Sequence, residues 1–211
     1  MEKNPTSADD LRTIRKIMEE STRFLSLSGL SGIFAGTFAT AGVIAAWLMI
    51  PGNQSMNINS SLVSLPDKES SGILIKMIID AGMVLVLSVI FALLFSIRRA
   101  RKTNTKIWTP ISKRLVVNLL IPLLTGGLFV IIVSIQKQYN LIIPGFLIFY
   151  GLALVNAGKF TYNEVFYLGI LELVTGLVSL LFPGLGLLFF LFGFGLLHIA
   201  YGLFMYRKYE A

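Results

Sequence analysis

Six long apolar stretches, separated by short polar ones, run along the chain. Each approaches the roughly 20 residues that an α-helix needs to cross a hydrocarbon core of about 30 Å. The pattern therefore predicts an all-α membrane protein with six transmembrane helices in three hairpins. The predicted spans are about 25–50, 73–97, 114–135, 141–158, 164–182 and 184–206.

The first 23 residues are polar and precede the six-span domain, which covers 24–211. Leu11, Ile14 and Met18 recur at helical spacing, and the arginines between them lie mostly off that stripe. This spacing predicts a short amphipathic helix that lies on the lipid headgroups. A lead-in that packs on the protein's own loops and a helix that binds a partner are the alternatives.

Lysine and arginine gather at one set of span ends. Segments 1–23 and 98–114 and the tail after Tyr206 carry five, seven and two of them, whereas the opposite side carries only Lys68 and Lys137. Cytoplasmic loops of membrane proteins carry an excess of Lys and Arg. The distribution predicts a multi-pass protein of the cell (cytoplasmic or inner) membrane with both termini in the cytoplasm.

Composition supports the membrane class and narrows the chemistry. Hydrophobic residues make up 55% of the chain and charged residues 14%, against about 25% charged in soluble domains. The absence of cysteine and the single histidine exclude disulfides, thiolate sites and multi-histidine metal clusters, so we expect no metal and no cofactor. The net charge of +7 lies at membrane edges, which argues against nucleic-acid binding and leaves the lipid bilayer as the main partner.

The segment between the second and third spans is the most basic one. It could bind anionic lipid headgroups at the cytoplasmic face, at about 1 kcal/mol per basic residue. The simpler interpretation is a cytoplasmic loop that obeys the positive-inside rule, and a protein partner is a further alternative. The headgroup candidates are Arg98, Arg99, Arg101, Lys102, Lys106, Lys113 and Arg114.

Small residues follow one another at four-residue steps in the first span. Ser28, Gly32, Gly36 and Thr40 would form a groove that another helix can approach closely. We favour packing within the molecule. A homo-oligomer or a membrane partner protein that uses the same groove is the alternative.

The chain shows internal similarity. Segment 151–162, GLALVNAGKFTY, aligns without gaps to 195–206, GLLHIAYGLFMY. Glycines seven residues apart also recur in the second half, and Pro-Gly appears once per predicted hairpin. These features indicate three parallel two-helix repeats.

Over about 170–206 the chain resembles the acid-resistance (HdeD-like) membrane proteins. The resemblance is carried by Gly176-Leu-Val-Ser-Leu-Leu-Phe-Pro183-Gly184 and by the Gly-rich apolar helix that continues through Gly202. It implies an integral membrane protein of three hairpins with a link to stress or acid tolerance. It carries over no catalytic residue.

Two ionisable residues lie deep in the last two spans. Glu172 and His198 are each about eight residues, or about 12 Å, from the cytoplasmic ends of their spans. Adjacent antiparallel helices could bring them together as a pair that relays protons or senses pH. The structural alternative is a clasp, in which protonated Glu172 bonds to His198, Thr175 or a backbone carbonyl.

Other polar residues fall within the spans. Asp80, a further proton-relay candidate, lies near the outer end of the second span, one turn from Lys76, with which it can pair. Asn118 and Asn156 lie near the cytoplasmic ends of their spans. They could line a cavity with the Glu172 pair or form hydrogen bonds between helices.

Three functions remain open from sequence. The first is a non-enzymatic integral membrane protein that supports or senses the membrane under stress. The second is a small proton-coupled transporter or channel that uses Glu172 and His198. The third is an intramembrane serine hydrolase, because Gly29-Leu30-Ser31-Gly32 looks like the Gly-x-Ser-Gly element of rhomboid proteases, with Ser31 and His198 as nucleophile and base. In rhomboids that serine lies on the fourth span, and we find no oxyanion group on the second span here.

Overall fold

The computed structural model describes residues 23–50 and 66–211. The predicted amphipathic segment 1–23 falls outside this range except for its last residue. Most of segment 51–72, which separates the first two predicted spans, also falls outside it. Across the described residues the chain is helical, without a strand, which confirms the all-α prediction.

Five helices come first. They are α2 (Gly29–Met49), α4 (Asp67–Lys102), α5 (Pro110–Ile135), α6 (Ile142–Gly158) and α7 (Asn163–Ser179). The short turn η1 (Tyr139–Leu141) leads into α6. The last apolar stretch is divided into the turn η2 (Pro183–Leu185), α8 (Gly186–Phe190), the π-helix η3 (Leu191–Leu197) and α9 (His198–Tyr209).

Five helical segments of the described chain are long and apolar enough to cross a membrane. They are Gly29–Met49, Lys68–Lys102, Pro110–Ile135, Tyr139–Gly158 and Pro183–Tyr209. The predicted fifth span, 164–182, corresponds to α7, whose 17 residues cover about 26 Å and fall short of a hydrocarbon core of about 30 Å. A sixth span therefore stays a prediction.

The observed helix ends differ from two of the predicted ones. α4 has 36 residues, about 54 Å, because charged residues on both sides of the apolar stretch 73–97 continue the helix. α2 begins at Gly29 and not near residue 25. The residues before it are not helical, because the backbone of Phe24 bonds to the turn between α6 and α7: its N–H donates to the Phe160 carbonyl at 2.7 Å.

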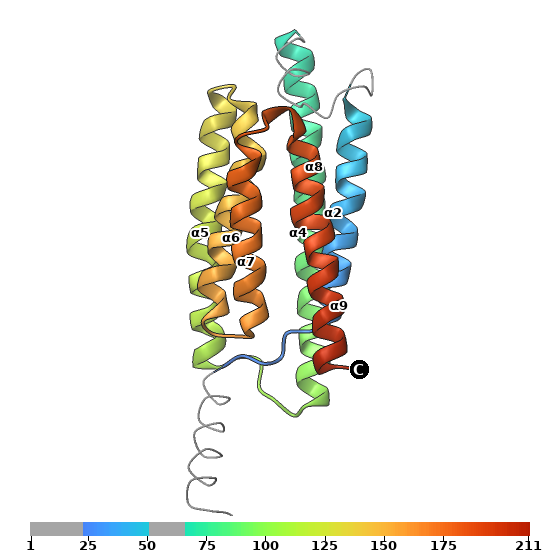
Figure 1. Ribbon diagram of the computed structural model, residues 1–211, viewed down its shortest axis with the longest axis vertical. Helices are drawn as coiled ribbons and strands as arrows, with labels where there is room; N and C mark the ends of the chain where they lie inside the picture. The colour runs from blue at the N-terminus through green and yellow to red at the C-terminus, as the bar shows by residue number, and fades with distance from the viewer. Residues whose placement is uncertain (1–22, 51–65) are drawn as a thin grey trace, which may run out of the picture.

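The helices form two groups of three (Figure 1). In one group α6 packs between α5 and α7; in the other, α2 packs against both α4 and α9. The third predicted hairpin is therefore not a compact pair, because α7 packs chiefly on α6 whereas α9 packs chiefly on α2. The boundary between the α5–α6–α7 group and the α2–α4–α9 group is called the seam below.

The outward faces of the two groups are apolar. Leu85 on α4 is 62% exposed and Leu124 on α5 is 65% exposed, and many leucines, isoleucines and valines around them are similarly open. Soluble monomers rarely expose continuous apolar patches larger than a few hundred Å². This surface indicates insertion into a membrane.

Glycines allow a close backbone approach inside each group. In the first, a Cβ on Gly151 of α6 would lie 2.7 Å from the Gly169 carbonyl oxygen of α7. In the second, a Cβ on Gly36 of α2 would lie 2.6 Å from the Gly195 carbonyl oxygen and 2.9 Å from the Ile199 nitrogen. The predicted groove of α2 thus receives the η3–α9 segment of the same chain.

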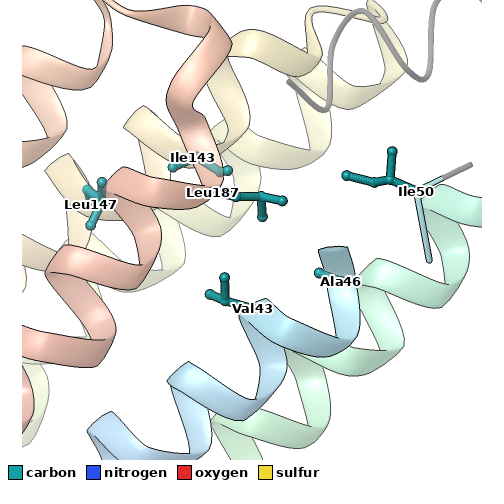
Figure 2. Packing of buried hydrophobic residues seen from close by; sticks show 6 residues of the cluster. All are labelled: Val43, Ala46, Ile50, Ile143, Leu147 and Leu187. Atoms are coloured by element: carbon teal, nitrogen blue, oxygen red, sulfur yellow. The ribbon is translucent and has the colours of Figure 1, made fainter. Parts of the chain in front are cut away.

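An apolar cluster closes the seam at the end where α2 finishes. Leu187 of α8 lies between Ile143 of α6 and Val43 of α2 (Figure 2). Leu147, which has no exposed surface, extends this cluster toward the middle of the bundle. Among the described residues, apolar side-chain packing therefore joins the two groups at this end.

Polar and charged residues join α2, α4 and the end of α9 to one another at the opposite end of the bundle, where α4 and α9 finish; this is called the basic end below. Arg99 of α4 forms an ion pair of 2.9 Å with Glu210, which follows α9. The Glu210 carboxylate in turn accepts hydrogen bonds from the Ser28 hydroxyl at 2.9 Å and from the Gly29 backbone N–H at 2.5 Å. A residue near the C-terminus therefore caps the first described helix.

We expect Gly36→Ala to destabilise the protein, because the new Cβ would collide with backbone atoms and force α2 away from α9. Overpacking of this kind costs about 1–3 kcal/mol. Gly127→Ala on α5 is the matched control, since nothing lies within 4 Å of its Cβ. Thermal unfolding in detergent should show a lower midpoint for Gly36→Ala only. Equal midpoints would contradict the backbone contact.

Candidate functional site

Glu172 lies in the middle of α7, and its side chain has no exposed surface. Neither carboxylate oxygen has an aligned hydrogen-bond partner among the described residues. A buried carboxylate loses solvation worth several kcal/mol unless a proton or a cation compensates for it. The environment of Glu172 therefore has to provide one or the other.

His198, the first residue of α9, can provide either. Its Nδ1 lies 3.2 Å from Glu172 Oε1, and the same nitrogen lies 3.2 Å from the Gly193 carbonyl oxygen, toward which its N–H is directed. Its Nε2 lies 2.8 Å from the hydroxyl of Tyr150 on α6. The contact between His198 and Glu172 is thus electrostatic, without a hydrogen bond aligned on the carboxylate.

The hydrogen-bond partners allow two charge states of the histidine. A carbonyl oxygen only accepts, so Nδ1 carries hydrogen in both. In the neutral ring Nε2 accepts from the Tyr150 hydroxyl, and in the imidazolium ion it donates to the same oxygen. The histidine can therefore gain or lose a proton at Nε2 without rotation of the imidazole ring, while its Nδ1–H stays directed at the Gly193 carbonyl.

The π-helix η3 makes room for the carboxylate. A Cβ on Gly193 would lie 2.5 Å from Glu172 Oε2 and 2.5 Å from Leu147 Cδ2. A larger residue would displace Glu172 or the core beneath it. Interruptions of α-helices by π turns occur often at functional sites, where they re-aim groups on the helix.

Aromatic rings and uncharged helices surround the pair. The ring of Phe194 stacks on that of His198 with centroids 5.8 Å apart, and Tyr150 lies against both. α2 and η3 contribute no titratable residue, and α6 contributes only Tyr150. Tyr201, the titratable residue next along α9, interacts electrostatically with Tyr150, and its buried hydroxyl has no partner among the described residues. Low polarity strengthens the attraction between Glu172 and His198.

Asp80 lies outside this cluster. A Cβ on Gly42 of α2 would lie 3.3 Å from Asp80 Oδ2, so its carboxylate faces α2. Lys76 is exposed, and within ranges 23–50 and 66–211 no ion pair joins it to Asp80, unlike the predicted pairing.

The two asparagines are also apart from the pair. The amide of Asn118 donates to the Arg114 carbonyl one turn earlier at 2.8 Å. Asn156 is half-buried on α6, and its side chain forms no hydrogen bond with another described residue. Neither one extends the cluster of Glu172, His198 and Tyr150.

The basic loop divides into one inward residue and several exposed ones. The guanidinium of Arg99 donates to the Leu27 carbonyl at 2.6 Å as well as to Glu210, so it is engaged within the protein. The remaining headgroup candidates are exposed: Arg98, Arg101, Lys102, Lys106, Lys113 and Arg114.

Ser31 does not meet His198 through a hydrogen bond in the described structure. Its hydroxyl donates to the Ser28 carbonyl at 2.5 Å, and both ring nitrogens of His198 have the other partners described above. The geometry lends no support to a nucleophile and base formed by these two residues.

Sequence reasoning did not single out Tyr150. It lies in an apolar span 48 residues from His198, and no local spacing links the two. The ion pair of Arg99 with Glu210 was missed for the same reason, since 111 residues separate the partners.

No group of three or more His, Cys, Asp or Glu side chains able to hold a metal ion occurs among the described residues. Comparison with known proteins finds no matching family model, no matching curated protein and no matching solved structure. The function is therefore argued from the geometry of the site.

Tyr162 connects three parts of the basic end. Its hydroxyl donates to the Leu25 carbonyl at 2.7 Å and accepts from Arg99 at 3.1 Å. Burial raises the pKa of Tyr162, and the nearby Arg99 charge opposes part of that rise. The neutral phenol is therefore the form that fits the folded protein.

We expect Tyr162→Phe to flatten the alkaline part of the stability profile. Since the folded pKa of Tyr162 is above its unfolded value of about 10, its pH-dependent contribution is complete below about pH 10 and is lost as the pH rises through the folded pKa. Unfolding midpoints in detergent from pH 8 to 11 measure the slope. Tyr167→Phe, at a 65% exposed site, is the control, and parallel slopes for wild type and Tyr162→Phe would contradict the account.

Proposed function

We propose that this chain is a non-enzymatic, multi-pass membrane protein that senses proton concentration through Glu172 and His198. The observation that carries the proposal is the fully buried carboxylate placed 3.2 Å from an imidazole at the seam. Ionisable residues within a membrane are costly and are most often retained for function.

The position of the pair gives the proton a structural effect. Glu172 and Tyr150 belong to the α5–α6–α7 group, whereas His198 and Gly193 belong to the segment that packs on α2. A change in the charge of either partner alters the attraction between the two groups. Protonation would therefore change how tightly the two helix groups pack against each other at the seam.

The proposed location in the cell is based on the sequence. The positive-inside distribution supports a cell membrane with both termini in the cytoplasm, and the described ends of the chain meet at the basic end, as Glu210 and Gly29 show. The resemblance over 170–206 supports a role in tolerance of acid or other stress on the envelope.

We expect the unfolding midpoint of the purified protein to change with pH, because the charges of Glu172 and His198 set the attraction across the seam. Glu172→Gln and His198→Gln should each abolish the change, since each removes one of the two groups whose charges attract each other across the seam. Thermal unfolding in detergent from pH 4 to 9 measures it. Asp80→Asn removes an intramembrane carboxylate outside the cluster and is the control.

A flat wild-type profile, with the two variants simply less stable, would refute proton sensing. The pair would then be a structural clasp. Removal of one partner of a buried ion pair costs about 3–5 kcal/mol, so a loss of stability alone does not distinguish the two roles.

A second candidate is a proton-coupled carrier, favoured by the location of the pair between two three-helix groups that could move relative to each other. Its test is proton entry into proteoliposomes loaded with a pH-sensitive dye, under an imposed pH gradient. We expect Glu172→Gln to abolish entry if the residue carries the proton. Equal rates in the wild type and the variant would remove Glu172 from any transport mechanism.

A further inference from the structure

A depression of about 450 Å³ opens at the basic end. Its walls are the extended segment after Arg23, the end of α4 and the start of α5. Pockets for small ligands commonly have volumes of about 300–1,000 Å³. We propose that this pocket, separate from the Glu172 pair, binds a phosphate monoester.

The charge of the pocket is positive and only partly compensated. Arg23, Arg99 and Lys106 line it, and no carboxylate of the described residues does. Arg99 is paired with Glu210, but Arg23 donates to the neutral amide of Asn163 at 3.1 Å. Lys106 is exposed, and no carboxylate of the described chain lies within ion-pair distance of it. Within ranges 23–50 and 66–211, two cationic side chains of the pocket therefore have no carboxylate partner.

Hydroxyl groups complete the polar wall. The Thr105 hydroxyl lies 3.0 Å from that of Ser26 and 3.0 Å from that of Thr103. These groups exchange hydrogen bonds with one another and can redirect them to an anion that enters. Thr109, the N-cap residue of the 26-residue helix α5, also lines the pocket, so the positive end of that helix lies at its edge.

This combination selects the chemistry of the ligand. A phosphate monoester carries about −1.5 to −2 charges and three acceptor oxygens, which match two cations and a row of hydroxyl donors. Phe24, Leu25 and Ile111 form an apolar side of the pocket, next to the start of an apolar helix. The monoester can therefore come from a lipid such as phosphatidic acid or from a small soluble molecule.

The test is ligand binding to the full-length protein in detergent, measured by microscale thermophoresis. Dihexanoyl phosphatidic acid and glycerol 3-phosphate present the same monoester with and without acyl chains, and dihexanoyl phosphatidylcholine is the zwitterionic comparison. We expect phosphatidic acid to bind more tightly than phosphatidylcholine. Arg23→Gln combined with Lys106→Gln should weaken binding about 30-fold, from about 1 kcal/mol per basic residue.

A matched variant separates the pocket from general surface charge. Lys159→Gln combined with Arg207→Gln removes two exposed cations that neither line the pocket nor belong to the headgroup candidates, and it should leave binding unchanged. Arg23→Lys combined with Lys106→Arg keeps both charges and should retain binding. Unfolding midpoints close to that of the wild type establish that each variant is folded.

The outcomes decide between the sources and test the site. Tight binding of phosphatidic acid without binding of glycerol 3-phosphate identifies a lipid headgroup, and similar binding of both identifies a soluble ester. The proposal is overturned if neither binds. It is also overturned if phosphatidylcholine binds as well as phosphatidic acid, or if the Lys159 and Arg207 variant loses as much binding as the pocket variant.

Discussion

The close approach of helix backbones at glycine is the constraint on which the rest of the structure depends. Gly151 and Gly169 bring α6 onto α7, and Gly36 and Gly195 bring α2 onto the η3–α9 segment. In a lipid environment helices gain little from hydrophobic burial against one another, so tight van der Waals contact has to hold them. Each of these two helix pairs lies within one three-helix group. The seam is the boundary at which the two groups contact each other.

The seam is held by three different interactions. Apolar side chains around Leu187 close one end, and at the basic end an ion pair of 2.6 Å joins Lys208 of α9 to Glu164 of α7. Between them lie Glu172 and His198, and their mutual attraction depends on whether each of them is charged. The packing of apolar side chains does not depend on pH, whereas the attraction between an imidazole and a carboxylate depends on their charges and so on pH. Of the three, the buried pair is the one suited to regulation.

Local patterns made much of this structure predictable. Length and hydropathy locate the helices, and the small-residue spacing of Gly32 and Gly36 marks the face of α2 that meets α9. The equal depth of Glu172 and His198 anticipated their contact at 3.2 Å. Helix ends were less accurate where the cause was tertiary: residues before Gly29 are not helical because Phe24 bonds to Phe160, far along the chain.

The unpredicted parts share a physical cause. Tyr150 reaches His198 across the seam, and Glu210 reaches Gly29 across almost the whole chain, so no periodicity within one helix could reveal either. Both were also hidden by ordinary composition, since a tyrosine in an apolar span or a glutamate in a tail is common. Yet both satisfy groups that would be costly to leave alone, a buried imidazole nitrogen and the N-terminus of a helix. Tyr150 and Glu210 therefore share one role: each forms a hydrogen bond with a polar group that helix packing has placed beside it.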